Sequence, residues 1–333
     1  MRRTSTTPVP ALLAVLALLL VLPLPGCSPK FTFFSAPTTD PLEEFVLQGK
    51  AAEKLALVHL TGFLAAQPRK GMLRATPSQL QELVSALDLA GDDPQVRGVV
   101  LAVDSPGGTT TASDILYHEI ADFKERTGKT VVVAMFDVAA SGGYYVALPA
   151  DWILAHPTTI TGSVGVVFMR PKLHGLFDKI GVDMEVSKSG EDKDMGSPFR
   201  PTSPEEAALF QVIIDDYAER FLSLVSKHRR LTEKNMELVR TARVFTANQA
   251  LAIGLIDQVG YIQDAFAKAR ALADLPEDAR IVTYRRDTYP NDNPYNTMTA
   301  ADSESASLLG LDAGFIMPPR AGFHYLWPQG MTR

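Results

Sequence analysis

The stretch KTVVVAMFDVAASGGYYVALPAD, residues 129–151, decides the fold because it joins a buried strand to a helix through a run of small residues. KTVVVAMF is a continuous apolar run rich in β-branched side chains, which is typical of a strand that is buried on both faces. The following GGYYVALPA favours a helix. A serine at this junction lies where helix N–H groups are unpaired and the helix dipole is positive, an environment that stabilises an oxyanion. Ser141 is therefore a candidate nucleophile.

Strand and helix patterns alternate on both sides of this stretch. Apolar runs predict strands at residues 55–64, 96–105, 130–136, 152–157, 163–169 and 183–189. Helical patterns occupy residues 77–89, 113–126, 173–180 and 202–230, and a short helix is expected directly after Ser141. Alternation at this spacing predicts βαβ units, parallel pairing and right-handed crossovers. The predicted fold class is α/β.

The segment 202–230 carries the clearest helix signal in the chain. Ser203 suits the N-cap, Pro204 suits the first turn, and Glu206 completes the pattern of a capping box. Apolar residues recur behind it at helical spacing: Leu209, Phe210, Ile213, Ile214, Tyr217, Phe221, Leu224 and Val225. We interpret this stripe as core or subunit interface rather than as a cofactor site.

The composition is that of a globular chain with enough apolar residues for one large core. Of the 333 residues, 46% are apolar, which predicts one main domain with appended ends. The 32 basic and 38 acidic residues give a formal charge of −6, which argues against nucleic acid as a partner. Neither a metal nor a cofactor is expected.

Residues 1–26 have the pattern of a signal peptide, with a basic start followed by the apolar run ALLAVLALLLVL. This run is too short to span a bilayer, which takes about 20 residues, so cleavage is expected. Cys27 is the single cysteine of the chain, and LPGC resembles the lipobox of bacterial lipoproteins. The resemblance implies a membrane-anchored lipoprotein of the bacterial cell envelope, on its extracytoplasmic side, with residues 27–53 as lipidated N-terminus and tether.

A second glycine pair supplies a candidate oxyanion hole for Ser141. AVDSPGGT, residues 102–109, ends a predicted buried strand with a proline and two glycines, which leaves bare N–H groups on a loop. If the two strands are neighbours, the N–H groups of Gly108 and Gly142 converge on one oxygen. Each such donor contributes about 2.7–4 kcal/mol of transition-state stabilisation.

The residues alone do not decide which side chain is the general base. His156 lies 15 positions after Ser141 at the end of a predicted strand, which is compatible with a Ser-His-Asp triad. Lys188 and Lys193 lie in a glycine-containing loop before the long helix. A lysine is protonated at its reference pKa of about 10.4, so it acts as a base only where burial lowers that pKa toward neutrality.

Four ordered motifs resemble the signal peptide peptidase A family, the S49 serine peptidases. They are DSPGGT, AASGGYY, ITGSVGV and KSGEDKDMGSPFRP, and the likeness extends from about Leu55 to Ala273. The resemblance implies the crotonase and Clp-protease type of fold, built from repeated β-β-α units with a helical C-terminal extension. It places the peptidase domain at residues 54–275 and a C-terminal extension with a flexible tail at residues 276–333.

The resemblance also implies a role for each matching residue. Ser141 in ASGGYY corresponds to the nucleophile, and Lys193 in SGEDKD to the general base. Ser163 in TGSVGV corresponds to the serine that orients the lysine, and Gly108 and Gly142 to the oxyanion hole.

The implied function is a membrane-anchored serine endopeptidase with a Ser-Lys dyad that degrades released signal peptides or other apolar peptides. Short members of the family carry one copy of the repeat, which implies a homo-oligomer, an octameric ring, in which one protomer contributes serine and its neighbour lysine.

The alternative is an inactive lipoprotein scaffold or peptide-binding protein of the same fold. A crotonase-type acyl-CoA enzyme is disfavoured because a secreted chain does not meet acyl-CoA. The terminal patch GFHYLWP, residues 322–328, either docks on a subunit or stays free.

Overall fold

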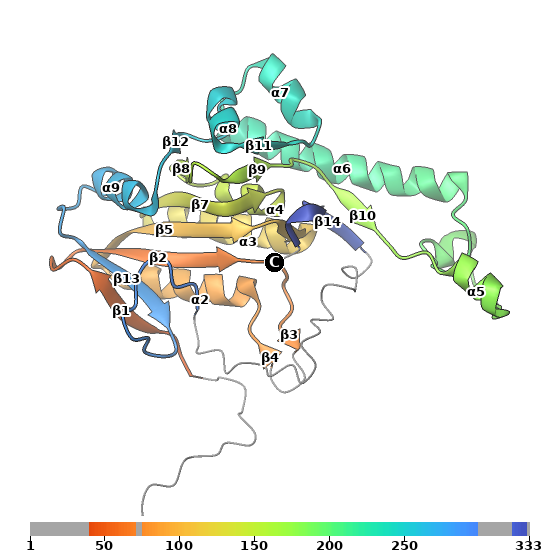
Figure 1. The fold of residues 1–333 in the computed structure, drawn as a ribbon, viewed down its shortest axis with the longest axis horizontal. Helices are drawn as coiled ribbons and strands as arrows, with labels where there is room; N and C mark the ends of the chain where they lie inside the picture. The colour runs from red at the N-terminus through yellow and green to blue at the C-terminus, as the bar shows by residue number, and fades with distance from the viewer. Residues whose placement is uncertain (1–39, 71–74, 299–321, 332–333) are drawn as a thin grey trace, which may run out of the picture. The chain divides into compact units, whose positions relative to one another are not determined.

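The computed structural model describes residues 40–70, 75–298 and 322–331, and Figure 1 shows how their helices and strands are arranged. The predicted signal peptide 1–26, the lipidation site Cys27 and residues 28–39 of the predicted tether lie outside the described residues. Those predictions are therefore untested by the fold.

A mixed sheet of nine strands forms the centre of the described part of the chain. Its order is β1 (Glu43–Gln48), β13 (Arg280–Arg285), β2 (Lys54–Thr61), β5 (Val96–Ser105), β7 (Thr130–Ala140), β8 (Trp152–Ala155) and β12 (Gln258–Val259), with β9 (Ile160–Gly162) on β7 and β11 (Val244–Thr246) on β9. Only the β1–β13 and β9–β11 pairs of this sheet are antiparallel. The predicted α/β class with parallel pairing is confirmed.

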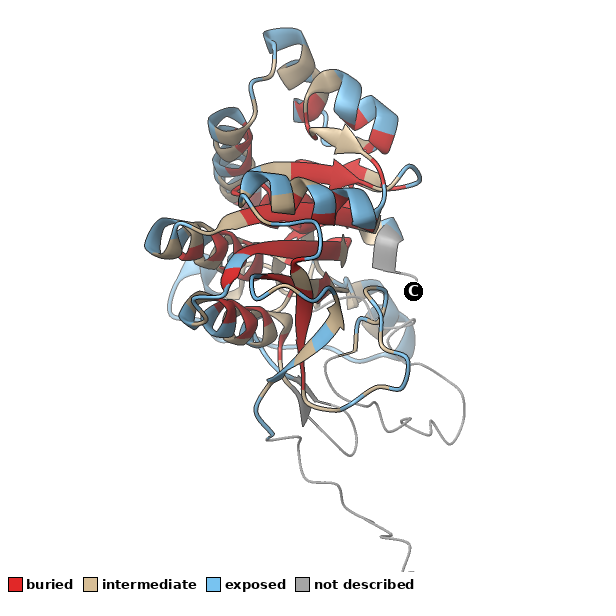
Figure 2. Cartoon of the chain, turned by 90° about the vertical axis from the view of Figure 1, so that its left-hand side faces the viewer, coloured by how far each residue is buried: buried red, intermediate tan, exposed pale blue. Residues whose placement is uncertain are grey.

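Helices cover both faces of this sheet. Helices α2 (Gln79–Asp92), α3 (Thr110–Thr127) and α4 (Gly142–Ala147) lie on one face, and α9 (Ile262–Leu272) packs on the other. Successive residues of a strand point to opposite faces, so Val100 of β5 packs in the α9 layer while Val99 and Leu101 pack in the opposite layer. Figure 2 shows the result, with buried residues in the strands and on the inward sides of the helices.

Two segments differ from the predicted strands. Residues 183–189, a predicted strand, form none, because they lie in a projecting segment where no strand of the described residues pairs with them. Within predicted strand 163–169, only β10 (Val167–Met169) is a strand, and it lies in a different sheet. Strands β1 and β13 extend the central sheet past both ends of the predicted domain 54–275, because β13 pairs with β2 in parallel.

The segment between β9 and β11 forms an arm on the central sheet. It contains α5 (His174–Ile180), the 3₁₀ helix η1 (Glu191–Asp194), α6 (Pro204–His228) and α7 (Glu233–Arg240), and α8 (Ala247–Ile253) follows β11. Phe221 and Val225 bury the inner half of α6 in the core, while α5 has no buried residue. Figure 1 shows α5 at the outer end of α6, away from the sheet.

A second sheet lies at the carboxyl end of β5. Its order is β10, β14 (Gly322–Leu326) and β6 (Gly107–Thr109), and both pairs are antiparallel. The predicted patch GFHYLWP therefore docks within its own chain. A short hairpin of β3 (Arg69–Lys70) and β4 (Ala75–Thr76) and a 3₁₀ helix η3 (Pro328–Met331) complete the elements of the described residues. Among these residues, no helix combines the length and the apolar character that a membrane crossing requires.

Candidate active site

Ser141 forms a sharp turn between β7 and α4. Its backbone has φ 53° and ψ −115°, a combination that is strained for a side-chain-bearing residue and costs about 1–3 kcal/mol. Its N–H donates to the carbonyl oxygen of Gly162 at 2.7 Å, and its own carbonyl oxygen accepts from Tyr145 N–H at 2.8 Å. The hydroxyl Oγ lies 3.5 Å from the carbonyl oxygen of Gly165, and no part of the residue is exposed in this conformation.

The glycines after Ser141 are required because α4 begins directly against other main chain. A Cβ on Gly142 would lie 2.4 Å from Ser113 Oγ, and one on Gly143 would lie 2.4 Å from the carbonyl oxygen of Ser105. Real Cβ atoms do not approach other atoms so closely, so these positions exclude larger side chains. The unusual run of small residues in the sequence is explained by this contact of α4 with β5 and α3.

The second glycine pair lies beside the first. Ser105 Oγ donates to the carbonyl oxygen of Gly62 at 2.6 Å and accepts from Gly107 N–H at 3.1 Å, which holds the DSPGGT loop in place. A Cβ on Gly107 would lie 2.7 Å from the main-chain nitrogen of Gly142. The loops of Gly108 and Gly142, predicted as an oxyanion hole, are therefore in contact next to Ser141.

A backbone hydrogen bond places Ser163 beside the Ser141 turn. It follows Gly162, which accepts the hydrogen bond from Ser141 N–H, and its own N–H donates to the carbonyl oxygen of Arg243 at 2.9 Å. Its backbone also has positive φ, 51°, and it is 8% exposed. The structure thus brings together four of the predicted site residues: Ser141, Ser163, Gly108 and Gly142.

Lys193 lies elsewhere in the single chain. It is exposed and belongs to η1, in the segment between β10 and α6 that Figure 1 shows near α5, at the outer end of the arm. Neither a hydrogen bond nor an ion pair connects this described residue to Ser141. The loop lysine Lys188 donates to Asp194 Oδ1 at 2.9 Å and to the carbonyl oxygen of Glu191.

An ion-pair network holds the loop that carries Lys193. Arg200 donates to Asp194 Oδ2 at 2.8 Å and to Glu206 Oε2 at 2.7 Å, and Arg170 donates to Glu206 Oε1 at 3.0 Å. Hydrogen bonds from Arg200 and then Lys188 lower the pKa of Asp194 well below its usual range. Burial alone would raise the pKa of Glu206, but bonds from Gly196 N–H, Arg200 and Arg170 lower it to about 2.

The predicted capping box at the start of α6 is wrong in one respect. Ser203 Oγ does accept from Glu206 N–H at 3.1 Å, which confirms Ser203 as the N-cap. The Glu206 carboxylate, however, is only 4% exposed and is taken up by the two arginines and by Gly196 N–H, so it does not return to the cap. Two guanidinium partners bind a carboxylate more strongly than one backbone N–H does.

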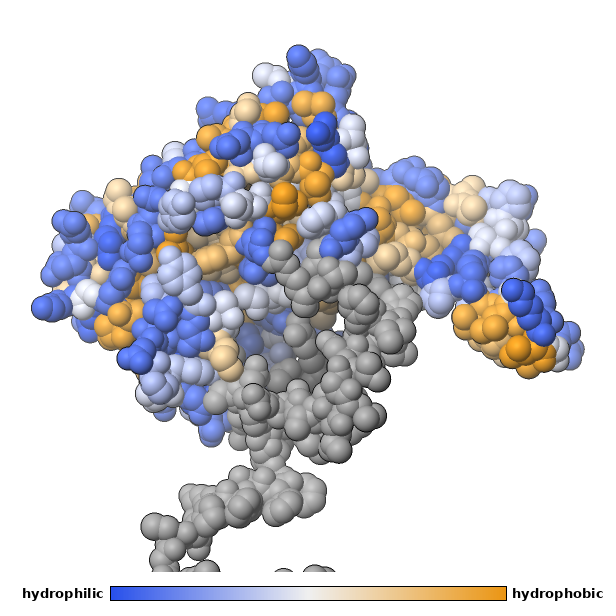
Figure 3. Space-filling view, in the orientation of Figure 1, coloured by the Kyte–Doolittle hydropathy of each residue, from blue (hydrophilic) through white to orange (hydrophobic). Residues whose placement is uncertain are grey.

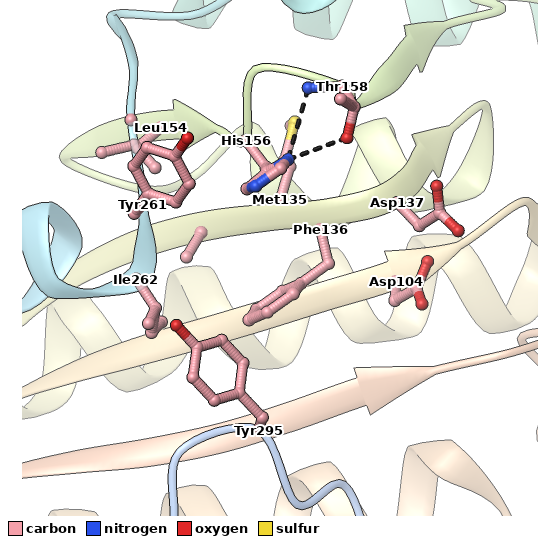
Figure 4. Close-up of a pocket in the computed structure, with 12 residues that line it drawn as sticks. Asp104, Met135, Phe136, Asp137, Leu154, His156, Thr158, Tyr261, Ile262 and Tyr295 are labelled. Carbon is pink, nitrogen blue, oxygen red and sulfur yellow. Dashed lines mark hydrogen bonds between the residues drawn. The ribbon is translucent and has the colours of Figure 1, made fainter.

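His156 belongs to a different part of the molecule. It lines a cavity of about 390 Å³ beside the middle of β7 and the carboxyl end of β8, and its Nδ1 lies 2.8 Å from Thr158 Oγ1. Figure 4 shows Tyr261 and Tyr295 in the same cavity, with Asp137 toward its other end. Ser141 is not among the residues that line the cavity, so His156 is unsupported as the base.

In the described part of the chain, no group of three or more His, Cys, Asp or Glu side chains is arranged to hold a metal ion.

Comparison with known proteins identifies the family. Residues 124–276, which include the Ser141 turn, match the model of peptidase family S49. A protein of Synechocystis named as a protease is 36% identical over 227 residues, 68% of this chain and 76% of that protein. The chain belongs to peptidase family S49. As an S49 member it is a serine peptidase, a hydrolase.

Two further relatives fit this S49 assignment. A protein of Enterococcus faecium named as a signal peptide peptidase, SppA, is 32% identical over 74% of this chain and 71% of that protein. The chloroplastic serine protease SPPA of Arabidopsis thaliana is 34% identical over 69% of this chain but only 34% of its own length. This S49 chain therefore corresponds to about a third of the longer plant protein.

Two residues of the S49 site were not predicted from the sequence. Gly107 has φ 102° and touches Gly142, whereas only Gly108 was predicted from the same pair. Gly162, with φ 85°, receives the Ser141 hydrogen bond. Both belong to quoted motifs, and a positive φ is what distinguishes a glycine that a turn requires.

Proposed function

We propose that this chain is a serine endopeptidase in which Ser141 is the nucleophile and Lys193 of a neighbouring copy is the general base. The single observation that carries the proposal is the strained, fully buried Ser141 turn, with two glycine loops in contact beside it. Strained backbone of this kind clusters at active sites. A protein that served only as a scaffold has no need of it.

The position of Lys193 supports a base supplied in trans. Within one chain the Lys193 side chain is exposed at the end of an arm, and a lysine becomes a base only where burial favours its neutral form. The arm also exposes large apolar side chains, with Leu176 54%, Ile180 61% and Val212 59% exposed. Figure 3 shows apolar surface at its outer end. Such residues on a projecting arm are the expected surface of a protomer contact.

The reaction then follows the general scheme of nucleophilic catalysis. Neutral Lys193 accepts the proton of the Ser141 hydroxyl as Oγ bonds to the carbonyl carbon of the substrate. Collapse of the tetrahedral intermediate breaks the C–N bond, and the leaving nitrogen takes the proton from Lys193. Water then gives a proton to the same amine as its oxygen bonds to the acyl carbon. Collapse of this second intermediate breaks the bond between that carbon and Ser141 Oγ, Oγ takes the proton back from Lys193, and the second product leaves. Ser163, beside the Ser141 turn, would orient the amine, and N–H groups of Gly108 and Gly142 would stabilise the oxyanion.

We also propose the setting in which this activity operates. The signal-peptide pattern of residues 1–26 and the lipobox at Cys27 support an extracytoplasmic, membrane-anchored lipoprotein of a bacterial cell envelope. Released signal peptides and other apolar peptides are the proposed substrates, in agreement with the name of the Enterococcus faecium relative. An octameric ring of the crotonase and Clp-protease type is the proposed assembly.

Complementation between inactive variants tests the shared dyad. Ser141→Ala and Lys193→Ala chains should each be folded and inactive on an apolar fluorogenic peptide, and their mixture should regain part of the activity. Lys179→Ala is the matched control, because Lys179 is another exposed lysine of the same arm, and it should stay active. Activity in Lys193→Ala alone would remove Lys193 from the mechanism, and two inactive variants whose mixture stays inactive would argue for a dyad within one chain.

A further inference from the structure

The cavity that contains His156 forms a second candidate site, separate from the Ser141 turn. Its lining includes Ala134, Phe136 and Leu154, which belong to the apolar layer between the sheet and α9. Helix α4, which follows Ser141, packs in the opposite layer. The volume of about 390 Å³ lies within the range of about 300–1,000 Å³ that is usual for small-ligand sites, which combine apolar walls with a few convergent polar groups.

Aromatic rings line most of this cavity. Tyr261 and Tyr295 lie in its wall with 57% and 61% of their surfaces exposed. The Tyr295 ring meets Phe136 at 6.3 Å between centroids and an interplanar angle of 89°. The Tyr261 ring meets His156 at 5.0 Å and 88°. Figure 4 shows these four rings around one space. Aromatic faces are the negative parts of the rings, so rings set at right angles around a space attract a cation.

Two carboxylates lie at the other end of the cavity. Asp104 of β5 and Asp137 of β7 line it, and Figure 4 shows them close together, beyond the Phe136 ring. Asp104 Oδ1 accepts the main-chain N–H of Val138 at 3.0 Å, and no described residue donates to its Oδ2. Neither lysine nor arginine occurs among the described residues that line the cavity. The charge at this end therefore favours a cationic ligand with hydrogen-bond donors.

The nearby end of α9 does not reverse this preference. Helix N-termini attract anions, and α9 begins at Ile262, which lines the cavity. Asp264 already supplies a carboxylate to this first turn, and its Oδ2 accepts Tyr261 N–H at 2.7 Å. An anionic ligand would in addition be repelled by the carboxylates of Asp104 and Asp137.

We propose that this cavity binds a primary ammonium group carried on an apolar stem. The ammonium group lies at Asp104 and Asp137 and donates to Asp104 Oδ2. The stem extends over Phe136 toward the two tyrosines, which supply apolar contact. Two sources provide this chemistry, a free amine and the lysine side chain of a peptide. The inference goes beyond the proposed function and does not rest on it, because its test measures binding alone.

A matched pair of ligands tests the role of the charge. Hexylamine, an ammonium ion at neutral pH, and hexanol have nearly the same shape and differ in charge. In isothermal titration calorimetry on the full chain, hexylamine should bind about tenfold more tightly than hexanol, because a charge-assisted hydrogen bond is stronger than a neutral one. Equal affinities, or no binding of hexylamine, would overturn the inference.

Asp104→Asn tests the proposed partner of the ammonium group. Asparagine keeps an oxygen that accepts Val138 N–H and removes the charge, so the backbone beside the cavity keeps its hydrogen bond. Hexylamine should bind this variant about tenfold more weakly, and hexanol should bind it as it binds the wild type, which verifies that the cavity is intact. Asp122→Asn, at an exposed residue of α3 outside the cavity, is the matched control and should bind both ligands normally.

Two results with Asp104→Asn would overturn the inference. An unchanged affinity for hexylamine would show that this carboxylate does not hold the ligand. An equal loss for hexylamine and hexanol would show that the cavity does not recognise the charge.

Tyr295 tests the aromatic wall. Tyr295→Ala should weaken hexylamine binding several-fold, and Tyr295→Phe, which keeps the ring, should restore it. Because Tyr295 is 61% exposed, neither change should disturb the core. Full affinity in Tyr295→Ala would remove this ring from the site.

A peptide pair distinguishes the two sources of the ammonium group. Acetylated and amidated Ala-Phe-Lys-Phe-Ala is compared with its norleucine counterpart, which lacks the ammonium group, in a Ser141→Ala chain that cannot consume them. Displacement of hexylamine by the lysine peptide alone would assign the cavity to a basic side chain of a peptide, and displacement by neither would assign it to a free amine. Equal displacement by both peptides would overturn the inference, because the charge would not matter.

Discussion

The main-chain N–H of Ser141 donates to the carbonyl oxygen of Gly162 at 2.7 Å, and this bond joins the two turns that carry the candidate serines. Ser141 and Ser163 both have positive φ, and Ser163 directly follows the acceptor. A displacement of one turn therefore displaces the other. The positions of the nucleophile and of the serine that would orient the base are set by one backbone contact, which explains why both turns accept unfavourable backbone angles.

Replacing Ser141 by glycine should stabilise the protein while abolishing its activity. Glycine adopts φ 53°, ψ −115° without the cost that a side chain incurs, so the free energy of unfolding should rise by about 1 kcal/mol. Activity should fall by about 10⁴-fold or more, as expected for loss of a nucleophile. Ser141→Ala is the control, because it removes Oγ and keeps the strain. Chemical denaturation of the three proteins measures the difference, and equal stability of the glycine and alanine variants would contradict the strain.

Gly107→Ala should inactivate the peptidase. Its Cβ would lie 2.0 Å from the position of the Tyr325 carbonyl oxygen, at a φ of 102° that disfavours side chains. The same Cβ would lie 2.7 Å from the main-chain nitrogen of Gly142 and would displace this oxyanion donor. Losing one donor lowers kcat by about 10²–10³-fold, and we expect at least that loss. Gly91→Ala in α2 is the matched control, because a Cβ there lies no closer than 3.5 Å to any neighbouring atom, and its kcat should stay unchanged. Retention of activity by Gly107→Ala would place the oxyanion site elsewhere.

Charge on the outer end of the arm should dissociate the proposed oligomer. Ile180, 61% exposed, belongs to the apolar surface of the arm, so Ile180→Asp should yield monomers in light scattering coupled to size-exclusion chromatography. Peptidase activity should disappear with the assembly, because Lys193 would no longer reach a neighbouring Ser141. Leu272→Asp, at an exposed leucine of α9, is the control and should remain assembled. An active monomeric Ile180→Asp would argue against a base supplied in trans.

The Glu206 network should make the Lys193 loop sensitive to acid. The pKa of Glu206 is lowered from 4.5 to about 2, so its contribution is complete above pH 4.5 and is lost as the pH falls toward 2. Glu206→Gln should cost about 1.5–3 kcal/mol at pH 7, toward the lower value because Arg200 is 34% exposed.

Denaturation of wild type and Glu206→Gln across this range measures the effect, and the gap between them should close below pH 4.5. Glu219→Gln removes an exposed ion pair with Arg240 and should show no such gap. A gap that persists unchanged at pH 2 would show that the carboxylate charge is not what stabilises the loop.

Elements with a strong local pattern were predicted well from the sequence. Strand β5 has the predicted bounds, 96–105, because its apolar centre, residues 99–103, is buried on both faces. Helix α6 begins at the predicted cap, because Ser203 and Pro204 act through neighbouring backbone groups alone. The two glycine loops were expected to converge if their strands were neighbours; β5 does pair with β7, and the loops are in contact.

Features that depend on distant partners were not predictable in the same way. The run 183–189 has strand-like composition, but a strand requires a neighbour, and no strand in the described part of the chain pairs with it. The patch 322–328 is apolar and aromatic in sequence. Its position beside β6 depends on strand pairing between residues that are more than 200 positions apart in the chain. The role of Lys193 rests on resemblance, because a single chain leaves it exposed at the end of the arm.

The position of β13 between β1 and β2 has a consequence for how the chain folds. Its partners in β2 lie more than 200 positions earlier, so the ribosome releases residues 43–61 long before the strand that must separate β1 from β2 exists. Contacts of such high sequence separation form slowly, and an unpaired apolar strand edge attracts other chains. A chain that stalls before residue 280 therefore presents the open edge of β2, and chaperone dependence should be greatest in that window of synthesis.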